Sequence, residues 1–113
     1  MRRGEVWEVN LDPSIGAEIK KIRPCVIVSR DALARLPLKI IVPLTEWKEG
    51  FARAPWHVLV EATPQNGLSK KTSADTYQVR SISEERLVTR LGELSNQVME
   101  EINKGLVLSL ALD

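Results

Sequence analysis

Cationic side chains gather directly before a short apolar segment, in the run Lys20-Lys21-Ile22-Arg23-Pro24. Pro24 fixes its own φ and disfavours helix at the preceding residue, so Arg23 is predicted to lie where a loop becomes a strand. Residues 25–28 are apolar and rich in β-branched side chains, which is typical of a buried strand. A guanidinium on the lip of a rigid strand can hold a phosphate. Taken alone, these residues favour the plainer interpretation, a solvated arginine beside a core strand.

The supply of other reactive side chains excludes several chemistries. The chain has a single histidine, His57, and a single cysteine, Cys25, so it can build neither a two-histidine acid–base pair nor a Cys/His zinc site. The glycines are scattered singly, which excludes a glycine-rich phosphate loop. Cys25 opens an apolar strand and is interpreted as a small core residue, and His57 as a packed or capping residue. Arginines, lysines, hydroxyls and backbone amides remain.

These remaining groups suit a phosphodiester that carries its own nucleophile, which is RNA. The ribose 2′-hydroxyl can attack the adjacent phosphate, and the protein then has to position it and stabilise the added negative charge. Such a reaction needs a bidentate cation and a neighbouring hydroxyl, so no metal or other cofactor is expected. A groove of this kind binds single strands, and Trp47 and Trp56 are candidate stacking platforms, whereas Trp7 is predicted to be core.

The overall composition is that of an ordinary globular protein. At 113 residues, with 43% hydrophobic and 27% charged residues, the chain is predicted to form one domain, residues 1–113. The net charge of +1 gives no global signal for nucleic acid. No signal peptide or membrane-spanning run is predicted, and a single cysteine fits a reducing compartment, so the cytoplasm is expected.

Apolar segments separated by turn residues predict a mainly β protein with helices, an α+β fold built as a small curled antiparallel barrel. The predicted strands are residues 5–11, 25–29, 38–43, 56–60, 72–82 and 87–94. Residues 45–55 have no clear period and are predicted to be a long loop.

Three helical segments are predicted between and after these strands. Residues 30–36 could make about two turns before Pro37 stops them. Residues 83–86 are predicted to form a single turn capped by Ser83. The final helix begins at Ser95, because apolar residues then recur at four-residue spacing, and Gly105 is expected to bend it or end it early.

Short motifs along nearly the whole chain resemble the MazF/PemK family of toxin endoribonucleases. They are Gly4-Glu5-Val6-Trp7, Asp12-Pro13-Ser14-Ile15-Gly16-Ala17-Glu18, Lys21-Ile22-Arg23-Pro24, Val42-Pro43-Leu44-Thr45, Gly67-Leu68-Ser69-Lys70, Gln78-Val79-Arg80-Ser81, Arg86-Leu87 and Leu91-Gly92-Glu93-Leu94. The resemblance implies an SH3-like barrel with a C-terminal helix that forms a homodimer and is inhibited by a MazE-like antitoxin occupying the RNA groove. It also implies sequence-specific cleavage of single-stranded RNA, leaving a 2′,3′-cyclic phosphate and a 5′-hydroxyl.

The resemblance also implies roles for individual residues. The family's catalytic arginine and threonine fall on Arg23 and Thr45, and its loop glutamate and its glutamine fall on Glu18 and Gln78. Arg23 is expected to bind the scissile phosphate rather than to exchange protons, because a guanidinium deprotonates only above about pH 12.

Three further cations, Lys20, Lys21 and Arg80, are predicted to contact the RNA, the two lysines at flanking phosphates. Several relatives carry an acid just before the glutamine, where this chain has Tyr77. On an extended strand Asp75 would point to the same face as residue 77 and could partly substitute for that acid.

Two alternatives to a nuclease remain at this point. The related barrel of CcdB-type toxins binds gyrase, a protein target, without hydrolysing anything. A plain RNA-binding barrel would bind single strands and leave them intact.

Overall fold

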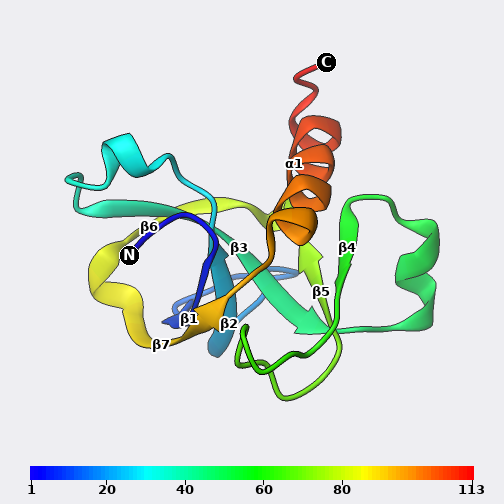
Figure 1. The fold of residues 1–113 in the computed structure, drawn as a ribbon, viewed down its shortest axis with the longest axis horizontal. Helices are drawn as coiled ribbons and strands as arrows, with labels where there is room; N and C mark the ends of the chain where they lie inside the picture. The colour runs from blue at the N-terminus through cyan, green and yellow to red at the C-terminus, as the bar shows by residue number, and fades with distance from the viewer.

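A computed structural model describes all 113 residues, Met1–Asp113. Seven antiparallel strands form one curled sheet, in the order β4-β5-β3-β2-β1-β7, with β6 also paired to β3 (Figure 1). The sheet is barrel-like but not closed, so the predicted curled antiparallel fold is confirmed only in that looser sense. The strands are β1 (Glu5–Asn10), β2 (Ile22–Ile27), β3 (Leu38–Glu46), β4 (His57–Val60), β5 (Thr72–Asp75), β6 (Arg80–Ser83) and β7 (Leu87–Glu93).

β3 is the longest strand and holds the sheet together. One edge pairs with β2 over Ile41–Pro43, and the other pairs first with β6 and then with β5. The expected single strand over residues 72–82 is therefore wrong, because the 3-10 turn η3 (Thr76–Gln78) separates β5 from β6. The break lies opposite Val42 and Pro43, and a proline has no N–H to offer a neighbouring strand.

Both faces of the sheet are covered by apolar side chains. One core cluster includes Val42 and Leu44 of β3 and lies under the C-terminal helix α1 (Asn96–Leu110), which contributes Met99 and Ile102. A smaller cluster lies on the other face of the sheet: Val9, Leu11, Cys25, Ile27, Ile41 and Ile82. Each strand residue of these clusters is at most a few per cent exposed, so the fold rests on burial from both sides.

The C-terminal helix begins where the sequence predicts. The hydroxyl of Ser95 accepts a hydrogen bond from the backbone N–H of Val98 at 3.2 Å, which is an N-cap. The expected early end at Gly105 is wrong, since the helix continues to Leu110. Gly105 lies against Thr76, and an added Cβ would stand 2.7 Å from the Thr76 Cγ2 atom, so the glycine allows close packing rather than an early end. None of the helices is both long and apolar enough to span a membrane.

Of the other two predicted helical segments, the first is shorter than expected and the second has the expected length. Residues 30–36 form only the 3-10 turn η1 (Asp31–Leu33). The buried Lys39 Nζ donates to the carbonyl oxygens of Ala34 and Leu36, both at 3.0 Å, so these carbonyls are not free to continue a helix. The single turn at η4 (Glu84–Arg86) is confirmed, with the Ser83 hydroxyl accepting from the N–H of Glu85.

Candidate functional site

Arg23 and Thr45 lie at the point where β2 and β3 separate. The last paired residues of the two strands are Cys25 and Pro43, and continuing this register by two residues sets Arg23 opposite Thr45. Residues two apart on a strand point to the same face, so both side chains lie on the face that carries Cys25 and Pro43. Beyond Pro43, β3 pairs with β5 on its other edge, with Thr45 opposite Ser73. The opening between β2 and β3 is therefore a cleft with Arg23 on one side and Thr45 on the other.

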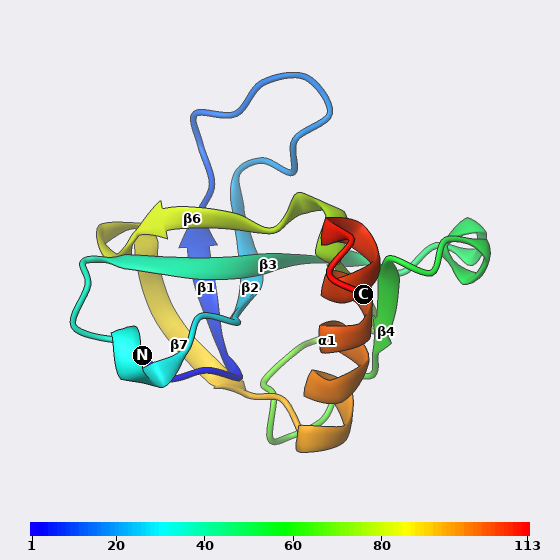
Figure 2. The ribbon, with the colours of Figure 1, turned by 90° about the horizontal axis from the view of Figure 1, so that it is seen from above.

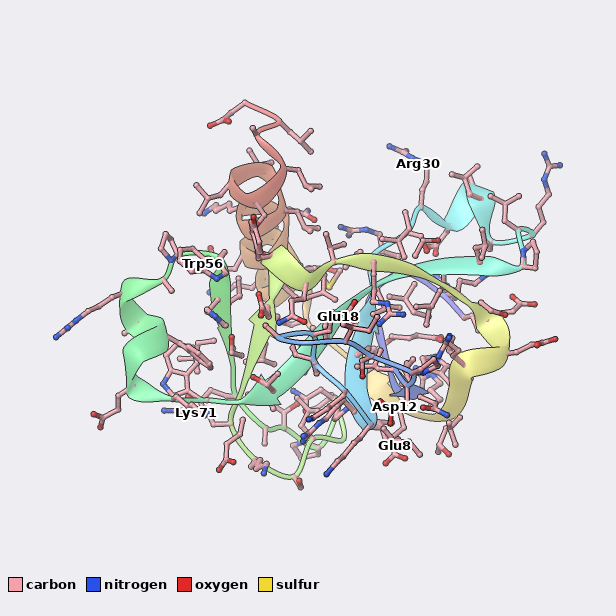
Figure 3. The ribbon with its side chains drawn as sticks, turned by 180° about the vertical axis from the view of Figure 1, so that it is seen from behind. Glu8, Asp12, Glu18, Arg30, Trp56 and Lys71 are labelled. Atoms are coloured by element: carbon pink, nitrogen blue, oxygen red, sulfur yellow. The ribbon has the colours of Figure 1, made fainter.

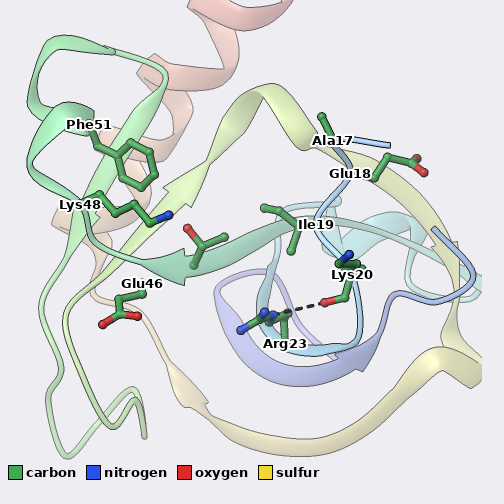
Figure 4. Close-up of a pocket in the computed structure, with 9 residues that line it drawn as sticks. Ala17, Glu18, Ile19, Lys20, Arg23, Glu46, Lys48 and Phe51 are labelled. Carbon is green, nitrogen blue, oxygen red and sulfur yellow. Dashed lines mark hydrogen bonds between the residues drawn. The ribbon is translucent and has the colours of Figure 1, made fainter. Parts of the chain in front are cut away.

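A pocket of about 340 Å³ fills this opening (Figure 4). Its lining combines residues from the loop before β2, the end of β3 and the segment after it: Ala17, Glu18, Ile19, Lys20, Arg23, Thr45, Glu46, Lys48 and Phe51. We call this the Arg23 pocket. It brings together four of the predicted site residues, Glu18, Lys20, Arg23 and Thr45.

The guanidinium of Arg23 is exposed and largely free to bind a ligand. The sequence places Arg23 at the end of a loop, but β2 already begins at Ile22, so the residue is held within the strand. Its Nε donates a hydrogen bond to the carbonyl oxygen of Lys20 at 3.2 Å (Figure 4). No carboxylate pairs with it in the structure. Two nitrogens of a planar fork therefore remain for a phosphate.

The loop that carries Lys20 is shaped by its own polar side chains. Asp12 Oδ1 accepts hydrogen bonds from the hydroxyl of Ser14 at 2.8 Å and from the N–H of Lys21 at 3.1 Å. These bonds, the Lys21 N–H first, lower the pKa of Asp12. Lys21 adopts a positive φ of 69°. It does not line the Arg23 pocket or either of the two pockets next to it. Its predicted contact with RNA remains a prediction.

Gln78 fixes the middle of the same loop. Its side-chain oxygen accepts from the N–H of Ile19 at 2.7 Å, and its side-chain nitrogen donates to the carbonyl of Ala17 at 3.4 Å. Glu18 accepts from the N–H of Ile15. In Figure 3 this loop crosses in front of the sheet, with Glu18 near the centre of the view. Gln78 thus supports the wall that Glu18 and Lys20 share.

A second pocket, of about 470 Å³, adjoins the first along this loop. Glu18 lines both pockets, whereas Gln78 and Arg80 line only the second. Arg80 is half-buried beside Cys25. Burial raises the pKa of the Cys25 thiol to about 12, with Arg80 opposing the effect, so Cys25 is an inert core residue as the sequence predicts.

The segment after β3 supplies two pocket residues that the sequence did not single out, Lys48 and Phe51. The predicted long loop is a short extension of β3 followed by the 3-10 turn η2 (Glu49–Arg53), in which Phe51 contacts His57 at the start of β4. The Phe51 ring stacks on His57, with centroids 3.7 Å apart and planes at 6°. Trp47 contacts the same ring edge-on at 5.8 Å. The only signal for these two residues in the sequence was that a cation, Lys48, and an aromatic residue, Phe51, follow shortly after Thr45.

The aromatic residue at the pocket is therefore Phe51, not the two tryptophans proposed from the sequence. Trp47 packs behind Phe51, and neither Trp47 nor Trp56 lines the pocket. Trp7 packs against the smaller core cluster, as predicted.

His57, which stacks on the Phe51 ring, is itself held by a hydrogen bond. Its Nδ1 lies 2.7 Å from the hydroxyl of Ser73, which is fully buried. Burial lowers the pKa of His57, and the nearby carboxylate of Asp75 opposes this. A neutral imidazole at neutral pH serves as a hydrogen-bonded packing group, in agreement with the sequence-based interpretation.

Asp75 is not placed to replace the acid that relatives carry. β5 ends at Asp75, so residues 75–77 are not the extended strand that the sequence predicts. Asp75 is buried and caps η3 by accepting a hydrogen bond from the N–H of Tyr77 at 3.1 Å, whereas Tyr77 is 71% exposed. The two side chains therefore have different surroundings.

The Arg23 pocket is suited to bind a phosphodiester. Three cationic side chains, Lys20, Arg23 and Lys48, surround the half-buried hydroxyl of Thr45, and a ring stands at one end. Cations bind the phosphate oxygens and a hydroxyl can donate to one of them. A ring beside the phosphate can support an unstacked base.

Comparison with known proteins finds relatives along nearly the whole chain. Residues 2–110 match the family model described as PemK-like, MazF-like toxin of type II toxin-antitoxin system. The chain is 36% identical to the endoribonuclease MazF9 of Mycobacterium tuberculosis, covering 99% of this chain and 98% of that protein. It is 33% identical to the endoribonuclease MazF of Staphylococcus saprophyticus, covering 99% and 92%.

Solved structures show the same fold. MazF from Deinococcus radiodurans superposes with a TM-score of 0.81 at 24% identity, covering 98% of this chain and 96% of that one. A mycobacterial endoribonuclease solved in complex with its cognate antitoxin superposes with a TM-score of 0.75 at 23% identity, covering 100% and 97%.

Proposed function

Because the chain belongs to the PemK-like, MazF-like family of toxins of type II toxin–antitoxin systems, we propose that it is an endoribonuclease acting on single-stranded RNA in the Arg23 pocket. The observation that carries the proposal is the position of an unpaired guanidinium opposite a hydroxyl across the cleft between β2 and β3. Neither alternative, a gyrase-binding toxin or a passive RNA-binding barrel, has such an observation in its favour.

The proposed reaction uses the substrate's own nucleophile. The 2′-oxygen forms a bond to phosphorus while the bond from phosphorus to the 5′-oxygen breaks; the 2′-hydroxyl loses a proton and the 5′-oxygen gains one. The products are a 2′,3′-cyclic phosphate and a 5′-hydroxyl. Arg23 binds the non-bridging oxygens and stabilises the added charge, and the Thr45 hydroxyl donates to the same group. Lys20 and Lys48 bind neighbouring phosphates, with an affinity that falls as salt rises.

Purified protein is expected to cut a long single-stranded RNA at defined sites, at an undiminished rate in EDTA. The reason is that a 2′-hydroxyl nucleophile and a guanidinium need no metal ion to stabilise the transferred charge. Primer extension would map the sites, and a sample prepared in parallel from cells carrying the Arg23→Ala variant would control for contaminating nucleases. Loss of cleavage in EDTA, restored by adding a divalent metal, would instead indicate carboxylate-bound metal chemistry.

We also propose that the chain works as a homodimer. Leu38 and Ile40 lie on the same face of β3 as Val42 and Leu44, but they are 51% and 43% exposed. In Figure 2, α1 covers the far end of β3 and leaves this first half open. Leu108 and Leu110, near the end of α1, are each 51% exposed. Such apolar patches are typical of protein contacts.

Ile40→Asp is therefore expected to convert a dimer to a monomer, because it buries a charge in an apolar contact. Light scattering coupled to size-exclusion chromatography would show the mass fall by half. Val88→Asp is the matched control, since Val88 is 55% exposed on β7, which pairs with β1 and not with β3, and this variant should remain dimeric. A monomeric wild-type protein would contradict the proposal.

An antitoxin is the expected second partner. The mycobacterial endoribonuclease that shares this fold was solved bound to its cognate antitoxin. We propose that a MazE-like antitoxin of this chain inhibits it by covering the Arg23 pocket, and that both proteins are cytoplasmic. Competition between the antitoxin and a short RNA for binding would test this inhibition.

A further inference from the structure

A separate pocket of about 210 Å³ lies on the other side of Arg23. It shares Arg23 and Glu46 with the Arg23 pocket and extends toward β1, β7 and the segment between β4 and β5. Its walls are apolar at Pro24, Leu44 and Leu91. A single strand whose phosphate rests on Arg23 would pass one nucleotide over each pocket. We call this separate pocket the Glu8 pocket, after the carboxylate that β1 contributes to its lining.

The outer wall of the Glu8 pocket is held rigidly. Asn66, which is 4% exposed, donates to the carbonyl of Glu61 at 2.8 Å, and its side-chain oxygen accepts from the N–H groups of Thr63 and Leu68. The segment is pressed onto β7: an added Cβ on Gly67, whose φ is +68°, would stand 2.2 Å from the carbonyl oxygen of Leu91. The pocket is therefore formed before any ligand binds.

Two polar groups in this pocket have no partner in the protein. The hydroxyl of Thr72 has no hydrogen bond, but it is buried in a residue that is only 4% exposed, so a ligand in the pocket does not reach it. The carboxylate of Glu8 also lines the pocket unpaired, whereas the neighbouring Glu5 is held by Trp7 and Arg90.

The Glu46–Lys70 pair lies at the same pocket, with nitrogen and oxygen 3.5 Å apart and both side chains more than half exposed. Because this pair satisfies itself and the Thr72 hydroxyl is buried, Glu8 is the group left to recognise a ligand. Apolar walls with one unpaired carboxylate suit a flat heterocycle that donates hydrogen bonds from its edge.

Building on the proposed ribonuclease function, we propose that the Glu8 pocket receives the nucleobase next to the scissile phosphate and selects a base that carries an amino group. Carboxylates accept hydrogen bonds from the exocyclic amines of bases. Adenine, cytosine and guanine each present such an amine. Uracil presents two carbonyl oxygens on either side of its one N–H, and the Glu8 carboxylate repels them.

The test compares short RNAs that differ only in the base on either side of the mapped cut. For the wild type, at one of these two positions, kcat/KM is expected to be about 10-fold or more lower with uracil than with the preferred base. In Glu8→Gln the amide can donate to a carbonyl, so this ratio should fall toward one. Glu100→Gln, an exposed change on α1, should leave it unchanged.

Two results would overturn the inference while leaving the ribonuclease proposal standing. One is a wild-type enzyme that accepts uracil equally well at both positions. The other is an unchanged ratio in Glu8→Gln. A wild-type protein that cuts no RNA would remove the proposed function itself, and the inference with it.

Discussion

Replacing Arg23 with alanine is expected to abolish RNA cleavage, with a fall in kcat of at least about 100- to 1000-fold. The guanidinium stands opposite the Thr45 position across the cleft and offers a planar fork of nitrogens to the pentacoordinate phosphate, whereas Lys20 and Lys48, which line the same pocket, each offer a single point charge. Single-turnover cleavage of an RNA labelled at its 5′ end measures the effect on the chemical step directly.

The fold should tolerate this change. Arg23 is exposed, and its one hydrogen bond, to the carbonyl of Lys20, holds a surface loop. The thermal midpoint and the mass in solution are therefore expected to match the wild type. Arg23→Lys keeps the charge but loses the bidentate fork, so an intermediate rate is expected. Arg35→Ala, an exposed arginine outside the pocket, is the matched control. Full cleavage by a nuclease-free Arg23→Ala preparation would exclude the mechanism.

Thr45→Val is expected to lower kcat by about 100-fold. Valine keeps the branched shape of threonine and its strand preference, so the variant removes only the hydroxyl that lines the pocket. Thr45→Ser restores a hydroxyl at the same atom and should recover most of the rate. Cleavage rates and the affinity for RNA would both be measured, since a loss confined to KM would show that the hydroxyl binds substrate without acting in the transition state.

A plain structural role for Thr45 would give a different result. If its hydroxyl only capped the strand end, both variants would keep the wild-type rate and only the thermal midpoint would move. The structure gives the Thr45 hydroxyl no protein partner of its own, which favours a role toward substrate.

Local secondary structure could be predicted from the sequence wherever residues that are neighbours in the chain determine it. Pro24 and the β-branched run after it predict a strand, and Ser95 with the spacing after it predicts the helix start. That Arg23 and Thr45 share one pocket could not follow from such patterns, because it depends on the register of β2 against β3. From the sequence alone, only the resemblance to a known family assigned the two residues to one site.

Tertiary contacts decided the features that were missed. Gly105 is typical of a helix breaker, yet it is the one residue type that fits against Thr76. Phe51 lies in a segment without any period, and its position depends on stacking with His57 on a different strand. The unpaired state of Glu8 and Thr72 likewise exists only in the folded chain.

The central claim is that the scissile phosphate binds between Arg23 and Thr45. A crystal structure of the protein with a single-stranded RNA carrying a 2′-deoxy nucleotide at the mapped cut would show the uncleaved phosphate directly. The predicted result is a non-bridging oxygen within about 3 Å of the Arg23 guanidinium and of the Thr45 hydroxyl. A phosphate bound elsewhere on the molecule, with Arg23 and Thr45 both facing solvent, would contradict the account.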